Sequence, residues 1–189
     1  MIPPLVSVQW LHDHLDNPGV VILNATQPHN QAGLSAGPDA AGIPGTRLVD
    51  LENDFSDPGN PLPHMLPAPA AFTQPCRRLG LHPNHHLVVY DNLGIYWSPR
   101  VWWMFTAMGH ENISVLDGGL PAWTAAGYAT EPARRDPFPA GTFTARSVPA
   151  AVSDARFVQD NLSTRRAVLI DARPEGRFNG QVPEPRQGL

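Results

Sequence analysis

Cysteine and charge are both scarce in this chain of 189 residues. Cys76 is the only cysteine, which excludes an intrachain disulfide and favours a reducing, cytoplasmic setting. Charged residues make up 16% of the chain, the formal net charge is −4, and basic residues form no run. A nucleic-acid partner is therefore not expected. A membrane partner is not expected either, because no apolar run approaches the ~20 residues of a membrane span and the first residues lack a signal-peptide pattern.

Familiar motifs for cofactors and metals are also absent from the sequence. It contains no Gly-x-Gly-x-x-Gly dinucleotide string, no Walker phosphate loop and no Cys-x5-Arg phosphatase string. His12 with His14, and His85 with His86, form pairs of imidazoles without a third and fourth ligand at metal spacing. We therefore expect neither a cofactor nor a metal.

What the chain does contain is an alternation of short apolar runs and helical patterns, with enough apolar residues (42%) to form a core. A helix around Cys76 should start late, near Thr73, or be kinked, because Pro75 lies inside its apolar pattern. The alternation predicts an α/β fold, with a central parallel sheet flanked by helices. The predicted strands cover residues 20–24, 47–51, 86–90 and 113–116, and the other helices residues 7–15, 98–109 and 119–127.

The loop that follows the strand at 86–90 is the stretch most typical of a binding site. Ser98 is a suitable N-cap for the next helix, Pro99 fits its first turn, and Gly109 is a natural stop. A strand that leads through a loop to a helix N-terminus often binds an anion, because free backbone N–H groups converge there. A plain strand–helix unit stays equally open, since the loop carries Asp91 and no nucleophile.

An internal repeat links the beginning and the end of the chain. Residues 157–173 align without a gap to residues 10–26 at an offset of 147, with apolar positions matched throughout and, for example, Asp13 and Asp160 identical. Two amphipathic helix–strand units could share this by chance. A duplication is favoured because both copies begin a domain-sized segment.

The repeat predicts three parts of the chain. Residues 1–128 form a first domain, residues 129–150 a proline-rich connection, and residues 151–189 the start of a second, incomplete copy. At the same offset, the counterpart of Asp91 would be position 238. We therefore expect the chemistry of the second copy's loop to lie beyond Leu189.

Several strings of the sequence are distinctive enough to carry a family resemblance. They are Gly42-Ile-Pro-Gly-Thr46, Pro61-Leu-Pro-His-Met-Leu-Pro67, Val88-Val-Tyr-Asp91, Ser98-Pro-Arg-Val-Trp-Trp-Met-Phe105, Val115-Leu-Asp-Gly-Gly119 and Asp171-Ala-Arg-Pro-Glu-Gly-Arg-Phe178 with Glu184-Pro-Arg186. They resemble those of the two-domain rhodanese-type sulfurtransferases, a family that includes thiosulfate and 3-mercaptopyruvate sulfurtransferases. In this family each domain is an α/β unit, the first domain is inactive, and the second carries a persulfide-forming cysteine in a tight loop. The resemblance implies that Asp91 occupies the corresponding loop of the inactive copy.

The same resemblance implies two arginines that bind an anionic sulfur donor, Arg177 and Arg186. A guanidinium grips a carboxylate or sulfonate in a planar fork, which lysine cannot do. Composition alone would leave both as solvated loop residues, and they can share a cleft only if the proline-rich stretch between them bends back. Arg173 is expected to brace the loop. Arg186 slightly favours 3-mercaptopyruvate over thiosulfate as the donor.

Four residues of the first copy are implied to face the same cleft. His64 and Glu52 would form a pair that orients a neutral imidazole for proton transfer, although a loop histidine capped by a carboxylate is an equal alternative. Tyr96 and Trp97 match an aromatic lid over the cleft and could instead be surface aromatics at a domain contact. Cys76 shares an apolar face with its helix neighbours, so it is expected to be a structural, inert thiol.

These observations predict a sulfurtransferase that moves a sulfane sulfur from a small anionic donor to a thiol or cyanide acceptor, through a cysteine persulfide beyond this chain. The 189 residues alone are then expected to be inactive, and a C-terminal half could be supplied as a separate chain. The alternative is a non-catalytic rhodanese-like binding or interaction module.

Overall fold

The computed structural model describes residues 2–28, 41–132 and 137–183, and divides into two compact units, Met1–Ala151 and Val152–Leu189. The predicted domain boundaries stay a prediction. The elements of the first unit are β1 (Leu5–Val6), α1 (Val8–Asp13), β2 (Val20–Asn24), β3 (Ala41–Gly42), β4 (Arg47–Leu48), α2 (Pro69–Arg78), β5 (His86–Tyr90), α3 (Ser98–Ala107), β6 (Ile113–Leu116), α4 (Gly119–Ala125), β7 (Glu131–Pro132) and a 3₁₀ turn (Pro149–Ala151). Those of the second unit are α5 (Ala155–Thr164) and α6 (Glu175–Phe178).

A five-stranded parallel sheet forms the centre of the first unit, in the order β1-β6-β5-β2-β4. Strands β2 and β5 pair along their whole length, with Ile22 opposite Val88. Strands β3 and β7 form a separate antiparallel pair. The α/β class with a central parallel sheet is thereby confirmed. The crossovers from β1 to β2, from β4 to β5 and from β5 to β6 run through α1, α2 and α3, as parallel pairing requires.

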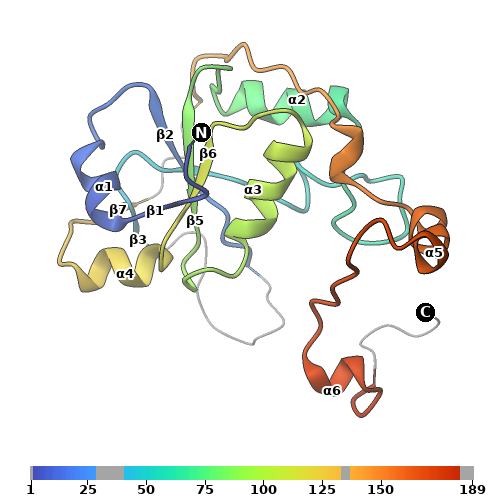
Figure 1. The fold of residues 1–189 in the computed structure, drawn as a ribbon. Helices are drawn as coiled ribbons and strands as arrows, with labels where there is room; N and C mark the ends of the chain where they lie inside the picture. Colours follow the sequence, from blue (N-terminus) through green and yellow to red (C-terminus); the bar gives the residue numbers. More distant parts are fainter. Residues whose placement is uncertain (1, 29–40, 133–136, 184–189) are drawn as a thin grey trace. The chain divides into compact units, whose positions relative to one another are not determined.

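Helices cover both faces of this sheet, α2 and α3 on one side and α1 and α4 on the other (Figure 1). Alternate residues of a strand point to opposite faces. In β2 and β5 this places Leu23 and Val89 in the cluster under α2 and α3, while Ile22 and Val88 pack under α1 and α4. Both faces are apolar because both are covered, so the strands appear in the sequence as continuous apolar runs.

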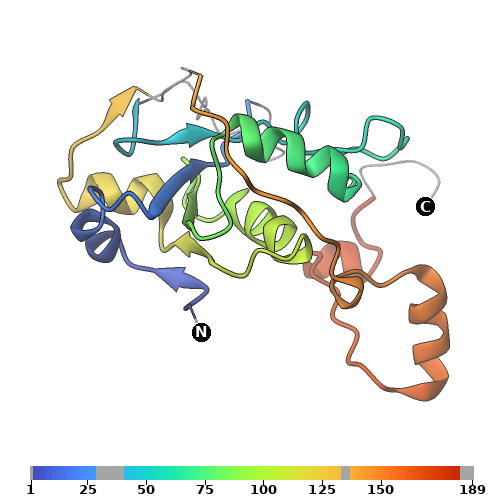
Figure 2. The ribbon, with the colours of Figure 1, turned by 90° about the horizontal axis from the view of Figure 1, so that it is seen from above.

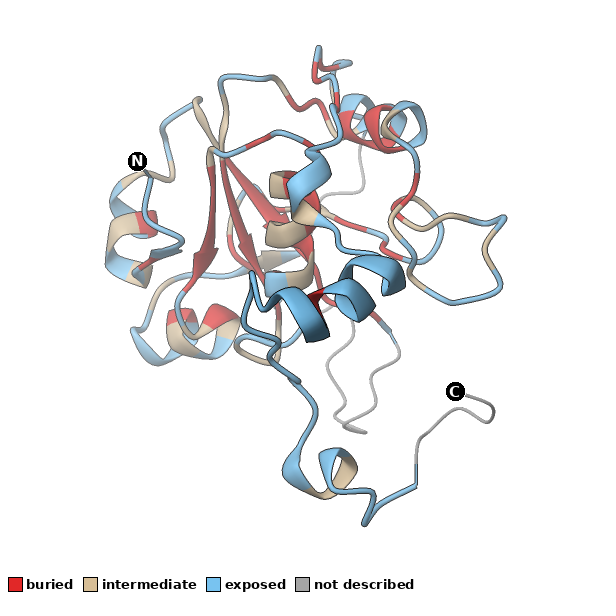
Figure 3. Ribbon diagram, turned by 45° about the vertical axis from the view of Figure 1, so that its right-hand side comes forward, coloured by how far each residue is buried: buried red, intermediate tan, exposed pale blue. Residues whose placement is uncertain are grey.

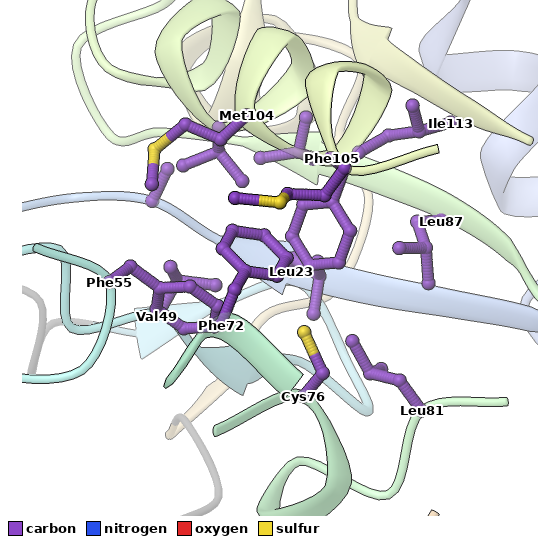
Figure 4. Packing of buried hydrophobic residues seen from close by; sticks show 14 of the residues in the cluster. Leu23, Val49, Phe55, Phe72, Cys76, Leu81, Leu87, Met104, Phe105 and Ile113 are labelled. Carbon is purple, nitrogen blue, oxygen red and sulfur yellow. The ribbon is translucent and has the colours of Figure 1, made fainter. Parts of the chain in front are cut away.

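Phenylalanine side chains from different elements meet in the larger of the two clusters (Figure 4). The rings of Phe72 and Phe105 meet edge to face with their centroids 5.1 Å apart, and Phe55 lies 5.0 Å from Phe72. Edge-to-face pairs of this kind add to the stabilisation that burial alone provides. Cys76 lies in the same cluster, fully buried.

Of the two alternatives predicted for α2, the late start near Thr73 is wrong, and a kink at Pro75 stays a prediction. The helix begins at Pro69, where proline is favoured, and runs through Pro75 to Arg78. Pro75 lacks only the N–H that would bond the carbonyl of Ala71, and Ala71 is on the exposed side of the helix, where water can satisfy that carbonyl. The pyrrolidine ring itself is buried.

Residues 141–148 form a strap that packs against α2 and α3 (Figure 2). The backbone N–H of Phe143 donates to Leu81, and that of Arg146 donates to Met108. The Phe143 side chain is only 2% exposed. The sequence predicts this stretch only as part of a proline-rich connection. It does more than connect, because the Phe143 ring packs against those of Phe72 and Phe105 in the larger cluster.

The second unit is mostly exposed (Figure 3). Its first helix, α5, begins 147 residues after α1, and both are capped by a side-chain oxygen at the preceding residue, Ser7 and Asp154. The duplication itself stays a prediction. The strand that the repeat predicts near Val168 is not formed, and Val168 and Ile170 are 86% and 85% exposed. Among the described residues of this unit no strand is present to pair with it.

No helix in the described part of the chain combines the length and apolarity needed to cross a lipid bilayer. The cytoplasmic setting stays a prediction.

Three histidines should make the first unit sensitive to acid. Burial lowers the pKa of His85, His86 and His110 from the ordinary value of 6.5. Below pH 6.5 the unfolded chain therefore binds protons that the folded chain does not bind. The contribution of these histidines to the free energy of unfolding is fully present above that pH and decreases as the pH falls. We expect Tm to fall steadily between about pH 7 and pH 5.5. A flat Tm over this range would contradict the prediction.

His86→Gln offers a control for that titration. The Nε2 atom of His86 lies 2.9 Å from the Ser114 hydroxyl, which itself donates to the Pro3 carbonyl, so the imidazole is the donor. A glutamine amide can donate in the same way without titrating. The variant should therefore show a shallower decrease of Tm with falling pH.

Candidate functional site

The candidate site lies at the carboxyl ends of β2, β4 and β5. In a parallel sheet, ligands bind beyond the carboxyl ends of the strands where the strand order reverses. Here the chain places β4 on one side of β2 and then returns to place β5 on the other side, so the reversal falls at β2. The loops that begin at Ala25, Val49 and Asp91 meet at this edge.

The loop after β5 is closed around the carboxylate of Asp91, which is fully buried. One oxygen, Oδ2, accepts hydrogen bonds from the backbone N–H groups of Tyr96, Trp97 and Ser98 at 2.8–2.9 Å and from the Ser98 hydroxyl at 2.8 Å. The other, Oδ1, accepts from the N–H of Leu93 at 3.0 Å. Hydrogen bonds to a carboxylate are shorter and stronger than neutral ones, so this carboxylate fixes the loop.

The donors that would receive an anion at the start of α3 are therefore occupied by a side chain of the same loop. N–H groups at a helix N-terminus carry partial positive charge, and here Asp91 satisfies them. The loop contains no thiol. Ser98 does not cap α3 as predicted. Trp97 holds the cap position, because the Ser98 hydroxyl is taken by Asp91. The predicted stop at Gly109 fits the end of α3 at Ala107, with Met108 as the C-cap and Gly109 next to it at φ 81°.

Gln27 joins the ends of β2 and β4 beneath the site. Its buried amide donates to the carbonyls of Ala25 and Val49, and its oxygen accepts from the N–H of Leu51. The side chain thus replaces strand pairing beyond Leu48, and β4 is shorter than the strand predicted over residues 47–51. A short buried clamp of this kind keeps the following loop in one conformation.

A pocket of about 340 Å³ opens above this clamp, and it contains both residues predicted to carry the chemistry, Glu52 and His64. Asp50 accepts hydrogen bonds from the N–H groups of Glu52 and Asn53 and so holds the backbone at one wall. The remaining lining residues are Gln27, Pro28, Ser56, Asp57, Pro58, Asn60, Leu62 and Pro63.

The structure brings Glu52 and His64 to one pocket but does not join them through Nδ1. Within the described ranges, Nδ1 of His64 is buried and has no hydrogen-bond partner. Glu52 and His64 are therefore two residues that line one pocket, and the use of the predicted Glu–His pair in proton transfer stays a prediction. A carboxylate and an imidazole that share a pocket can still exchange a proton through one water molecule.

The two predicted lid residues differ in their surroundings. Tyr96 is exposed, whereas Trp97 is partly buried and its ring lies 5.9 Å from the His64 ring in an edge-to-face arrangement. Tyr96 and Trp97 also contact each other edge to face at 5.4 Å. Trp97 thus belongs to the wall that holds His64, and a lid role for Tyr96 stays a prediction.

The two predicted donor-binding arginines, Arg177 and Arg186, lie beyond the first unit in the chain. Arg177 is part of α6 in the second unit, and Arg186 lies outside the described residues. Their grip on a donor therefore stays a prediction. Arg173 forms an ion pair with Asp171, which lowers the pKa of that carboxyl and agrees with the expected bracing role.

Cys76 has the properties of a structural thiol. It is fully buried in α2, and burial raises the pKa of its thiol far above the ordinary value. We expect the folded chain to react with a thiol reagent such as 5,5′-dithiobis(2-nitrobenzoate) at least ~100-fold more slowly than the chain unfolded in guanidinium, because only the exposed thiolate reacts. Equal rates in the two states would contradict this. Among the described residues, no group of three or more His, Cys, Asp or Glu side chains is arranged to hold a metal.

Sequence reasoning missed two residues that shape the site. Gln27 gave no signal because a buried glutamine clamp is recognisable only from its partners. Arg100 lies in the distinctive string at the start of α3, and its guanidinium donates to the main-chain carbonyl of His64. Its place one turn into a helix that follows a candidate loop was the only available signal.

Comparison with known proteins gives one consistent result. Residues 7–126 match the rhodanese-like domain family. The chain is 36% identical to thiosulfate/3-mercaptopyruvate sulfurtransferase 2 of Arabidopsis thaliana and 38% identical to the 3-mercaptopyruvate sulfurtransferase of Escherichia coli K12, over 98% and 97% of its length. It spans 60% and 66% of the lengths of these two relatives.

A solved structure agrees with these relatives. The crystal structure of SseA from Escherichia coli, described as showing the rhodanese fold and catalytic mechanism of 3-mercaptopyruvate sulfotransferases, matches with a TM-score of 0.85 at 35% identity. The match covers 99% of this chain and 72% of that one. The chain therefore belongs to the rhodanese-like domain family.

Proposed function

We propose that this chain is part of a sulfurtransferase that moves a sulfane sulfur from 3-mercaptopyruvate or thiosulfate to a thiol or cyanide acceptor. The observation that carries the proposal is the similarity along nearly the whole chain to relatives that bear these names. The pocket at the carboxyl ends of the strands, with Glu52 and His64 in its wall, supports it.

The reaction requires a thiolate that attacks the sulfur of the donor. With 3-mercaptopyruvate, the cysteine sulfur bonds to the donor sulfur, the carbon–sulfur bond breaks, and the electron pair stays on the carbon as an enolate. That carbon collects the proton released from the donor thiol, which yields pyruvate and a cysteine persulfide. An imidazole beside the donor can carry this proton, and we assign that task to His64, with Glu52 setting the charge of the pocket.

The persulfide-forming cysteine lies outside these 189 residues in this proposal. Cys76, the only cysteine, is buried in α2 with a raised pKa. The loop that would hold a nucleophile presents the Asp91 carboxylate instead, with its oxygens already bonded. The thiol is then supplied by a second domain that begins near residue 151, where Arg177 and Arg186 grip the anionic donor.

The test compares the 189-residue chain with the protein encoded when the gene is read to its natural stop codon. Pyruvate released from 3-mercaptopyruvate in the presence of dithiothreitol, and thiocyanate formed from thiosulfate and cyanide, are measured for both. We expect turnover only for the longer protein. Turnover by the 189 residues alone would overturn the assignment of the nucleophile, and no turnover by a folded longer protein would overturn the function.

A second candidate is a binding module without catalysis, and the closed Asp91 loop favours it. The Asp91 carboxylate fills the anion position, so this loop offers neither a nucleophile nor a free anion site. This candidate requires that the gene end at Leu189 and that no second fragment copurify. A denaturing gel and an intact mass of the protein from its native source separate this case from a separately supplied C-terminal half.

A further inference from the structure

His64 is held in a backbone conformation that a histidine does not adopt readily. Its φ is 57°, in the left-handed region, and it is one of two non-glycine residues with positive φ among those described. In this region Cβ crowds the following carbonyl, so a non-glycine residue stays there only when its surroundings hold it. The ring direction depends on this φ, since a return to negative φ would turn Cβ away from its present position.

Arg100 holds the backbone of His64 from the side of α3. Its guanidinium donates to the carbonyl oxygen of His64, which is 36 residues earlier in the chain. The guanidinium also lies over the ring of Trp103, with its central carbon 4.6 Å from the ring centroid. This stacking fixes the plane of the guanidinium, so the donor reaches His64 from one direction.

Trp97 holds the ring of His64 from the same helix start, and the Asp91 loop fixes Trp97. The edge-to-face contact between the two rings is 5.9 Å, and the N–H of Trp97 is bonded to the Asp91 carboxylate at 2.9 Å. Backbone and ring of His64 are thus both set by residues of the closed loop and the first turn of α3.

We propose that Arg100 is a positioning residue that fixes the conformation of His64, and hence the direction of its imidazole in the pocket. The closed Asp91 loop then has a positioning role although it contains no nucleophile, because it places Trp97 and the first turn of α3 against His64. The part of this inference that concerns turnover rests on the proposed function. The part that concerns conformation does not.

The structure provides a closely matched control in Arg47. Its guanidinium also donates to a main-chain carbonyl, that of Leu79, and lies 4.6 Å from the centroid of an aromatic ring, that of Phe138. Burial lowers the pKa of both arginines. Arg47 contacts neither His64 nor α3 in these interactions, so Arg47→Met removes the same kind of contact elsewhere.

The first measurement needs no activity and uses the 189-residue chain. Histidine labelled in its ring is incorporated, and the His64 signal in the proton–carbon spectrum is identified by its loss in His64→Gln. We expect Arg100→Met to move or split the His64 signal, Arg100→Lys to do so less because an ammonium can still donate, and Arg47→Met to leave it in place. If Arg100→Met does not fold, the comparison of Arg100→Lys with Arg47→Lys decides.

A His64 signal that responds equally to substitution of Arg100 and of Arg47 overturns the proposal. The second measurement uses the longer protein with 3-mercaptopyruvate. A misdirected imidazole should lower kcat by about 10- to 100-fold, with little change in the donor KM, and Arg47→Met should lower neither. If His64→Gln leaves kcat unchanged, the catalytic task of His64 in the proposed function is wrong, whereas the spectrum still decides whether Arg100 positions it.

Discussion

Asp91→Ala should lower the free energy of unfolding of the first unit by about 3–5 kcal/mol. The substitution removes the acceptor for five hydrogen bonds at a fully buried position. Three of the N–H groups left behind belong to consecutive residues at the start of α3. A buried donor without an acceptor destabilises the fold by the full free energy of its desolvation. Urea unfolding followed by circular dichroism measures the loss.

Asp50→Ala is the control for that variant. The Asp50 carboxylate accepts three hydrogen bonds, from the N–H groups of Glu52 and Asn53 and from the Asn53 amide, but it is exposed. Water can replace it, so the expected loss is about 1 kcal/mol or less. Similar losses for Asp50→Ala and Asp91→Ala would show that burial of the Asp91 carboxylate is not what stabilises the loop.

Gly119→Ala should lower the free energy of unfolding by about 2–5 kcal/mol, from left-handed strain and overpacking together. Gly119 has φ 56°, and a Cβ there would lie 2.3 Å from the carbonyl oxygen of Gly94 and 2.5 Å from that of Asp91. Both atoms are backbone, so neither can rotate away. The loop that contains Asp91 and Gly94 would have to move away from α4. We expect the fluorescence of Trp97, which lies at the end of this loop, to change as a result.

Gly127→Ala separates these two contributions. Gly127 also has a positive φ, 78°, but a Cβ there meets nothing within 4 Å. The expected loss is about 1–2 kcal/mol, from the backbone conformation alone. If Gly119→Ala costs no more than Gly127→Ala, the close approach between α4 and the Asp91 loop does not constrain that loop.

The regular elements of the first unit were largely predictable because their signals are local. The apolar runs at β2, β5 and β6 and the stop at Gly109 depend on neighbouring residues only. The errors arose where distant groups intervened. Pro75 is tolerated because of the side of α2 on which the carbonyl of Ala71 falls, and β4 ends early because Gln27 takes over its hydrogen bonds.

The sequence named two residues that line the candidate pocket, Glu52 and His64, but it missed Gln27 and Arg100 and could not give the geometry. The roles that the resemblance implied for Glu52, His64 and Asp91 stay predictions. The absence of a partner on Nδ1 of His64, its positive φ and its hold by Arg100 could not be predicted. They depend on atoms that are far apart in the chain.

By itself the sequence determined the order of β2, β5 and β6 with the helices α1 to α4, the family resemblance and the presence of a single cysteine, because each follows from residue types or local patterns. The tertiary structure alone decided that the donors at the start of α3 close on Asp91, that Gln27 joins two strand ends, and that Arg100 reaches His64. The physical reason is that a hydrogen bond between residues 22 or 36 positions apart forms only after the sheet and its helices have packed.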